Sequence, residues 1–119
     1  MSKIVGLSRL ALQVRNVQNA RVFYEQVLGL EVASAAPDRV QYNTEPPIEI
    51  RAALVELDAA NAHLTWGCSV VLRSENVEAL FERVRIHNAR ITRPLSGGPF
   101  GYSFDFQDPD GHRLTAVAA

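Results

Sequence analysis

The chain has 119 residues, 47% of them hydrophobic, and its 12 lysines and arginines against 13 acidic residues give a formal net charge of -1. This length predicts one domain, and the balanced charge excludes a broad field that would attract nucleic acid or a membrane surface. No apolar run approaches the ~18 residues of a transmembrane helix, and the N-terminal residues lack the apolar core of a signal peptide. A lone cysteine, Cys68, cannot form an intrachain disulfide, so we expect a cytoplasmic protein.

The first half of the chain predicts a strand, a helix and three more strands. Apolar residues alternate over 10–14, which is the period of a strand. Asn16 is a candidate N-cap for an amphipathic helix over 17–28, and Gly29 is expected to end that helix in a left-handed conformation. Between proline-containing turns we expect the strands 30–35, 39–43 and 49–57, followed by a linker over 58–65.

The second half repeats this order of elements. Val70 and Leu72 belong to a predicted strand, and Ser74 is a candidate cap for a helix over 75–87. Three further strands are expected near 90–93, 101–107 and 112–117. A shift of 58 residues superposes apolar positions of the two halves, for example Leu12 on Val70. Since the order of all five elements repeats, this indicates an internal duplication rather than a chance match of two βα units.

Two short segments carry a family resemblance. Residues 23–30, FYEQVLGL, close the first helix, and residues 104–112, FDFQDPDGH, lead into the last strand. Together with the doubled βαβββ order they resemble the vicinal oxygen chelate superfamily, which includes glyoxalase I, extradiol dioxygenases, fosfomycin-resistance enzymes and bleomycin-resistance proteins. The resemblance implies an α+β fold and a homodimer. Two βαβββ modules, about 5–58 and 66–118 of a single domain over 1–119, would form a cup-shaped mixed sheet.

The resemblance also implies where a metal would be held, by up to four histidine or glutamate side chains lining the cup. The matching positions here are Arg9 in the first strand, Gly67 in the second half, and Thr115 beyond the last turn. A guanidinium, a glycine and a neutral hydroxyl are poor ligands for a divalent ion. Only Glu56, placed on the fourth strand, has a ligand-type side chain, so we expect no metal and no cofactor.

The turn and histidine residues have plainer interpretations. The carboxylates of Asp108 and Asp110 are expected to bond amides of a tight turn. The three histidines, His63, His87 and His112, are expected at the surface or at helix ends rather than as ligands.

Strand alternation predicts which side chains line the cup. The ligand-binding candidates are Arg9, Gln13, Glu56, Trp66, Ser69, Tyr102, Arg113 and Thr115. Arg9 would either bind an anionic group of a ligand or pair with Glu56. Trp66 would either stack on a planar ligand or pack in a core or interface.

The leading hypothesis is a metal-free protein that binds a small apolar or anionic molecule, similar to the bleomycin-resistance proteins. The alternative is a lyase, isomerase or dioxygenase of the same superfamily, with displaced metal ligands or with Glu56 as a catalytic base. A third hypothesis is an interaction module whose cup is filled by its own side chains. The sequence leaves open whether the cup forms within one chain or across a homodimer.

Overall fold

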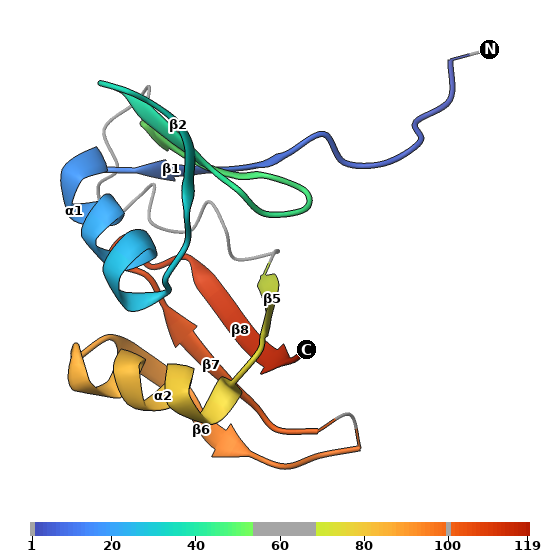
Figure 1. Cartoon of the computed structure of the whole chain (residues 1–119), viewed down its shortest axis with the longest axis vertical. Helices are drawn as coiled ribbons and strands as arrows, with labels where there is room; N and C mark the ends of the chain where they lie inside the picture. The colour runs from blue at the N-terminus through green and yellow to red at the C-terminus, as the bar shows by residue number, and fades with distance from the viewer. Residues whose placement is uncertain (1, 54–68, 100) are drawn as a thin grey trace.

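A computed structural model describes residues 2–53, 69–99 and 101–119. These residues form two mixed sheets of four strands, each covered on one face by a helix (Figure 1). The α+β fold and the doubled βαβββ order predicted from the sequence are therefore confirmed. Among the helices described, none is long and apolar enough to cross a membrane.

The first module begins with strand β1, and its helix follows this strand directly in the chain. Its elements are β1 (Leu10–Val14), α1 (Val17–Arg21), the π-helix η1 (Val22–Val27), β2 (Val32–Ala36), β3 (Arg39–Tyr42) and β4 (Ile48–Ala52). The strand order is β1-β4-β3-β2, with β1 parallel to β4 and the other pairs antiparallel.

The second module repeats this topology. Its elements are β5 (Val70–Ser74), α2 (Val77–Ile86), β6 (Arg90–Ser96), β7 (Ser103–Gln107) and β8 (Arg113–Ala118). The strand order is β5-β8-β7-β6, again with the first and last strands parallel.

The first helix starts where the sequence predicts, and its last turns form a π-helix, which is wider than an α-helix. The Asn16 side chain accepts a hydrogen bond from the Asn19 amide at 3.0 Å, which satisfies one of the free donors of the first turn. Near its end the Leu28 amide bonds to the carbonyl of Phe23, five residues back, as in a π-helix. Gly29 then takes a φ of 76°, a left-handed conformation that favours glycine, and ends the helix.

The second helix starts two residues later than its predicted cap. Its N-cap is Asn76, whose side chain accepts from the Ala79 amide at 3.0 Å. The prediction of Ser74 as the cap is wrong, because Ser74 is the last residue of β5. Its hydroxyl instead accepts from the Asn76 amide at 3.2 Å, which guides the chain into the cap. His87 lies at the C-cap of this helix, as expected.

The caps set the true repeat distance between the modules. Asn16 and Asn76 are 60 residues apart, and so are Leu10 and Val70, the first residues of β1 and β5. The offset of 58 residues matched the apolar pattern but shifted the alignment by two. A shift of two preserves the inward and outward alternation of a strand, so the pattern alone could not reveal the error.

The last three strands differ from prediction mainly in length. β6 continues to Ser96, beyond the predicted end at residue 93, although it contains Pro94. Proline is tolerated there because β6 is an edge strand, and register shifts on either side of Arg93 keep it paired with β7.

The two motif segments meet at the junction of the modules. The Tyr24 hydroxyl donates to Asp108 Oδ2 at 2.6 Å, and both residues are buried. The other oxygen of Asp108 accepts from the amides of Asp110 and His112 at 3.0 and 2.8 Å, so its predicted role in the turn is confirmed. His112 is buried rather than at the surface, because the turn brings its Nε2 within 2.7 Å of the Gln13 carbonyl, to which it donates.

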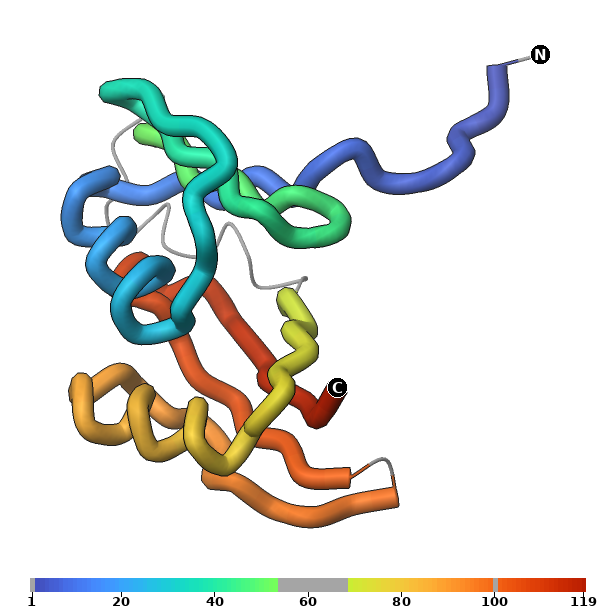
Figure 2. Tube along the Cα trace, in the orientation of Figure 1, coloured from blue at the N-terminus to red at the C-terminus, as the bar shows by residue number. Residues whose placement is uncertain are grey.

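Aromatic packing and one arginine complete the junction. The rings of Phe23 and Phe106, one from each module, lie 6.2 Å apart, and Phe104 stacks against Phe106 at 5.1 Å. Arg83 of α2 donates from Nε to the Val27 carbonyl, at the end of η1, at 2.6 Å. The two helices consequently lie side by side on the same side of the molecule (Figure 2).

We expect Tyr24→Phe to lower the free energy of unfolding by about 1–3 kcal/mol, because it removes a donor from a buried carboxylate. Urea denaturation monitored by circular dichroism measures this change. Tyr102→Phe is the matched control, since Tyr102 is 53% exposed, and should leave the midpoint unchanged. Equal effects of the two substitutions would contradict a stabilising role for the Tyr24–Asp108 bond.

The same carboxylate should make stability depend on pH. Burial raises the pKa of Asp108 above its ordinary value, although His112 and the hydrogen bond from Tyr24 oppose this shift. A carboxyl that holds its proton more tightly in the folded state stabilises the fold below its ordinary pKa. That contribution is lost as the pH rises through the raised pKa.

We therefore expect the free energy of unfolding of Asp108→Asn, minus that of the wild type, to increase from acid to neutral pH. Asparagine can keep the two amide hydrogen bonds but does not titrate. Urea titrations at a series of pH values measure this difference. The contributions of the other carboxylates are the same in both proteins and cancel in the difference. Parallel curves for the two proteins would show that Asp108 does not titrate abnormally.

Candidate functional site

The candidate site lies on the sheet faces that point away from the helices, called here the open faces. Leu12 of β1 and Ile50 of β4 are buried on the helix-covered face. Residues next to them in each strand point the other way, because side chains alternate. The strand pairing places Glu49 beside Ala11 and Arg51 beside Gln13 on the open face of the first sheet.

Glu49 lies between two arginines on this face. Its side chain is only 5% exposed, and its Oε2 lies 3.0 Å from Nη2 of Arg51 and 3.7 Å from Nε of Arg9. Neither Glu49 Oε2 nor the buried Nε of Arg51 has a hydrogen-bond partner, so the 3.0 Å contact is a charge contact without hydrogen-bond alignment. The cluster therefore contains one buried acceptor and one buried donor that have no hydrogen-bond partner.

This cluster contains an acidic residue that the sequence analysis did not place in the cup. Glu49 pairs with Ala11 in the first sheet as Thr115 pairs with Val71 in the second, so Glu49 and Thr115 occupy equivalent positions. The sequence analysis gave that position to Glu56 by placing the fourth strand over 49–57. The described part of β4 is Ile48–Ala52, and Glu56 lies outside the described residues.

The 60-residue repeat likewise changes the counterpart of Arg9. It is Ser69, a predicted site residue that is exposed and directly precedes β5, rather than Gly67. Gly67, Trp66, His63 and Cys68 lie outside the residues that the structure describes.

The open face of the second sheet carries a bonded polar network. Arg93 donates to both oxygens of Asp105, at 3.0 and 3.2 Å, and to the Ser103 hydroxyl at 2.8 Å. The predicted site residue Thr115 donates to Asp105 Oδ1 at 2.8 Å. The Arg93 hydrogen bond, with a smaller contribution from Thr115, lowers the pKa of Asp105 and keeps it ionised.

The side chains at the four family ligand positions do not fit a divalent ion. In the corrected register they are Arg9, Glu49, Ser69 and Thr115, with one carboxylate that already contacts two guanidinium groups. Two adjacent positive charges repel a cation. Within residues 2–53, 69–99 and 101–119, no group of three or more histidine, cysteine or acidic side chains is placed to hold a metal.

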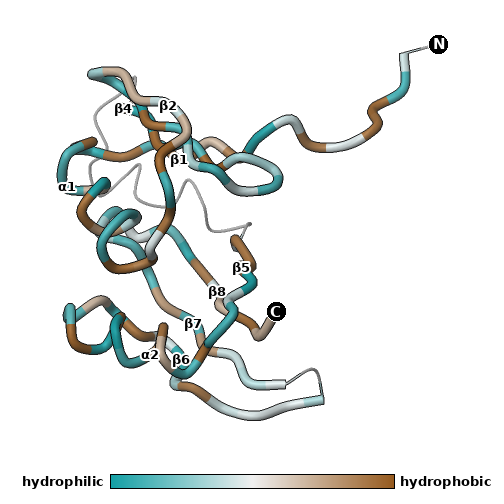
Figure 3. Tube along the Cα trace, viewed as in Figure 1, coloured by the Kyte–Doolittle hydropathy of each residue, from teal (hydrophilic) through white to brown (hydrophobic). Residues whose placement is uncertain are grey.

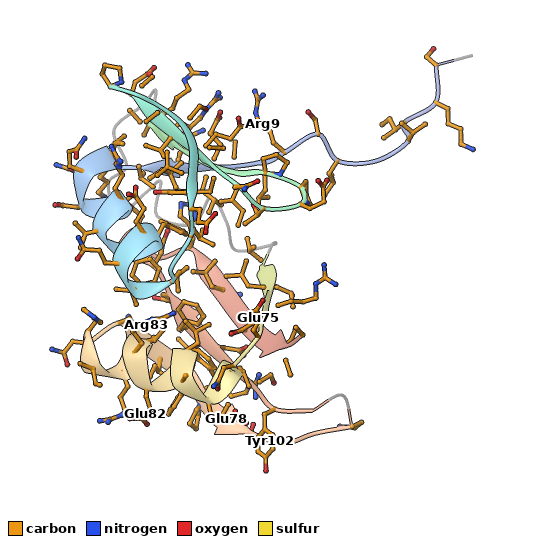
Figure 4. The ribbon with its side chains drawn as sticks, in the orientation of Figure 1. Arg9, Glu75, Glu78, Glu82, Arg83 and Tyr102 are labelled. Atoms are coloured by element: carbon orange, nitrogen blue, oxygen red, sulfur yellow. The ribbon has the colours of Figure 1, made fainter. Side chains whose placement is uncertain are left out.

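Arginines gather on the open faces although the whole chain is nearly neutral. Strand register places five there, and the contact of Arg9 with Glu49 adds a sixth. They lie against the carboxylates of Glu49 and Asp105, and Asp38 in an adjoining turn is bonded to one of them. The six arginines are Arg9, Arg39, Arg51, Arg73, Arg93 and Arg113. Other acidic side chains, Glu75, Glu78 and Glu82, lie on or beside α2 (Figure 4). Among the residues that the structure describes, the balance of charge on these faces therefore favours an anion.

The structure brings only some of the predicted site residues together. Gln13 lies beside the Glu49 cluster, through its pairing with Arg51. Arg113 begins β8 and pairs with Gln107 on the second sheet. Tyr102 is half exposed and lies at the end of the molecule opposite Arg9, so one chain does not bring these two side chains together (Figure 4).

A family model of the glyoxalase/bleomycin resistance protein/dioxygenase superfamily matches residues 6–115. The chain belongs to this superfamily. No curated protein sequence matches it significantly.

Several solved structures share the fold of this chain at low sequence identity. A protein of unknown function from Agrobacterium tumefaciens str. C58 is 20% identical, with a TM-score of 0.76 over 99% of this chain and 97% of that one. A glyoxalase-related enzyme from Fulvimarina pelagi is 16% identical, with a TM-score of 0.74 over 98% and 89%. The bleomycin-binding protein of bleomycin-producing Streptomyces verticillus, complexed with copper(II)-bleomycin, is 19% identical, with a TM-score of 0.68 over 100% and 99%.

The sequence analysis missed Glu49 and Arg51, the central pair of the cluster. A signal for them exists in residues 48–52, IEIRA, where two isoleucines alternate with two opposite charges. That is the pattern of a strand with one buried and one polar face. Beginning the strand at Ile48 would have placed both charges on the open face.

We expect Glu49→Gln to lower the free energy of unfolding by about 1–3 kcal/mol, because it removes the negative charge that two guanidinium groups contact. Equilibrium urea denaturation measures the change. Glu82→Gln is the matched control: Glu82 pairs with Arg85 on the surface of α2, where solvent screens the pair. An unchanged midpoint for both variants would show that the Glu49 contacts contribute nothing to stability.

Proposed function

We propose that this member of the superfamily is a metal-free protein that binds a small anionic or partly apolar molecule on its open faces. The observation that carries the proposal is the Glu49 cluster. Arg9 occupies one family ligand position, and Arg9 and Arg51 both contact Glu49, which occupies another. Arginine side chains bind carboxylate or phosphate groups through paired hydrogen bonds. The superfamily membership supports a binding role, since the structurally similar Streptomyces verticillus protein binds bleomycin.

The polar networks suggest how such a ligand would be held. Arg51 has a buried Nε without a hydrogen-bond partner, and it lies beside the unpartnered Oε2 of Glu49. An anionic group of the ligand would accept from Arg51, and a hydroxyl or amine of the ligand would donate to Glu49. Apolar and planar parts would contact neighbouring side chains, Trp66 among the predicted ones.

A homodimer is part of this proposal. Arg9 and Tyr102 lie at opposite ends of one chain, so a cup lined by both would need residues from two protomers (Figure 4). We propose that the open faces of two copies together enclose the ligand, and that the protein acts in the cytoplasm, as its single cysteine suggests.

We expect planar carboxylates to bind the metal-free protein and matched planar amines not to bind. Quenching of the fluorescence of Trp66, the one tryptophan of the chain, reports binding, and isothermal titration calorimetry gives the affinity. Arg51→Gln should weaken carboxylate binding by roughly tenfold or more, since ~1.4 kcal/mol corresponds to tenfold. Arg85→Gln, on the surface of α2, is the control and should bind as the wild type does.

Two results would contradict the proposal. Elemental analysis of protein purified without chelator would contradict the metal-free state by finding a stoichiometric divalent ion. A panel in which amines bind as well as carboxylates, or in which Arg51→Gln binds normally, would remove the anionic-ligand assignment.

A further inference from the structure

A groove lies between the end of the second helix and the first module. Four segments line it, namely Arg15 after β1, Phe23 of η1, residues 87–90 from the end of α2 to the start of β6, and residues 107–111 at the turn from β7 to β8. Its volume is about 520 Å³, within the range of roughly 300–1,000 Å³ of small-molecule sites. None of the lining residues belongs to the Glu49 cluster, so the groove is a second candidate site.

The charged side chains of the groove leave one cation unpaired. Asp110 Oδ1 accepts from the amide and from Nη1 of Arg15, at 2.9 and 3.3 Å, so these two charges offset each other. Both oxygens of Asp108 accept hydrogen bonds within the junction. Arg90 is exposed at the start of β6 and forms no ion pair with any residue that the structure describes. Its guanidinium donors are therefore available to a ligand.

The rest of the lining combines neutral donors with a small apolar area. The side chains of Asn88 and Gln107 carry amide donors. The two helices beside the groove alternate between hydrophobic and hydrophilic residues along their turns (Figure 3), and Phe23 and Ala89 bring an apolar part into the lining. The groove therefore suits a molecule with one polar end and one apolar end.

The duplicated fold has an equivalent corner beside the end of the first helix, and an arginine occupies it. By the 60-residue repeat of the helix caps, Arg83 is the counterpart of Phe23. Arg83 donates to the Val27 carbonyl, and a Cβ at Gly29 would lie 3.5 Å from its Nη2. Gly29 and Asn88 are the left-handed residues after the two helices, with φ of 76° and 59°. A guanidinium thus lies beside one helix end, whereas Phe23 leaves the groove open beside the other.

The charges at the two corners are reversed. Arg15 and Glu75 each directly precede the N-cap of their helix. Strand pairing makes Arg90 and Glu31 counterparts, 59 residues apart because the π-helix adds one residue to the first helix. The corner with two glutamates contains a cation of the chain itself, Arg83. In the corner with two arginines, Arg90 has no ion partner among the described residues, so charge complementarity favours an anion there.

We propose that this groove binds a small organic anion, with its phosphate or carboxylate group on Arg90 and its apolar part near Phe23. A guanidinium binds either oxyanion through two parallel hydrogen bonds. The amides of Asn88 and Gln107 would donate to the remaining oxygens. Both modules line the groove, so the ligand would also stabilise their junction. This inference does not depend on the proposed function, which concerns the open faces.

An NMR titration of the ¹⁵N-labelled full chain tests the proposal, with phenyl phosphate and benzoate as the two oxyanions. We expect the backbone amides of residues 88–90 and Gly111 to shift as either acid is added, and the tighter ligand identifies the preferred oxyanion. Benzylamine carries a cation on the same ring and should not shift these amides. Inorganic phosphate lacks the ring and should bind more weakly than phenyl phosphate.

A matched pair of variants tests the contact with Arg90. Arg90→Gln removes the guanidinium from the groove, and Arg85→Gln removes the same charge from an arginine that pairs with Glu82 on the surface of α2. We expect Arg90→Gln to weaken the binding that the groove amides report by about tenfold or more. Arg85→Gln should bind as the wild type does. The same amide spectra show whether each variant is folded.

Three results would overturn the inference: no shift at the groove amides with either acid, equal shifts with benzylamine, or unchanged binding by Arg90→Gln. The open faces are tested separately, because Arg51→Gln should lose carboxylate binding there and keep it in the groove. Loss of groove binding in Arg51→Gln would show one shared site and would also overturn the inference. A failure of binding on the open faces alone would overturn the proposed function and leave the groove standing.

Discussion

The hydrogen bond between Tyr24 and Asp108 is the contact on which the relation of the two modules depends. Tyr24 belongs to the helix of the first module, and Asp108 opens the last turn of the second. Asp108 also accepts hydrogen bonds from two backbone amides of its turn, so the tyrosine is bonded to a carboxylate that is held in place. A buried carboxylate without these donors would cost several kcal/mol, so the two segments are needed together.

At this junction the helix of the first module contacts the helix, β7 and the last turn of the second module. Arg83 bonds the end of the first helix, and Phe23 packs near Phe106 across the junction. With the helices placed together, no helix of the described residues packs on the sheet faces opposite to them. The polar clusters of Glu49 and Asp105 lie on those faces, which explains how a site can be prepared on a fold whose core is elsewhere.

Local signals in the sequence predicted the parts of the fold that depend on a few neighbouring residues. The cap at Asn16, the stop at Gly29 and the turn at Asp108 each follow from side-chain chemistry within a few positions. Register could not be predicted in the same way, because it is set by pairing between strands far apart in the chain. The assignment of Glu56 instead of Glu49, and the repeat of 58 instead of 60, both arise from that missing information.

The character of the Glu49 cluster favours a binding role over a purely structural one. Burying a carboxylate costs desolvation energy that contacts with guanidinium groups only partly offset, and an apolar residue of similar size is often as stable. In the second module the equivalent position holds Thr115, a neutral residue, with no loss of the strand pairing. The sheet therefore does not require a charge at this position. The proposed binding role would give this position a reason to keep an acid that is only 5% exposed and has an oxygen without a hydrogen-bond donor.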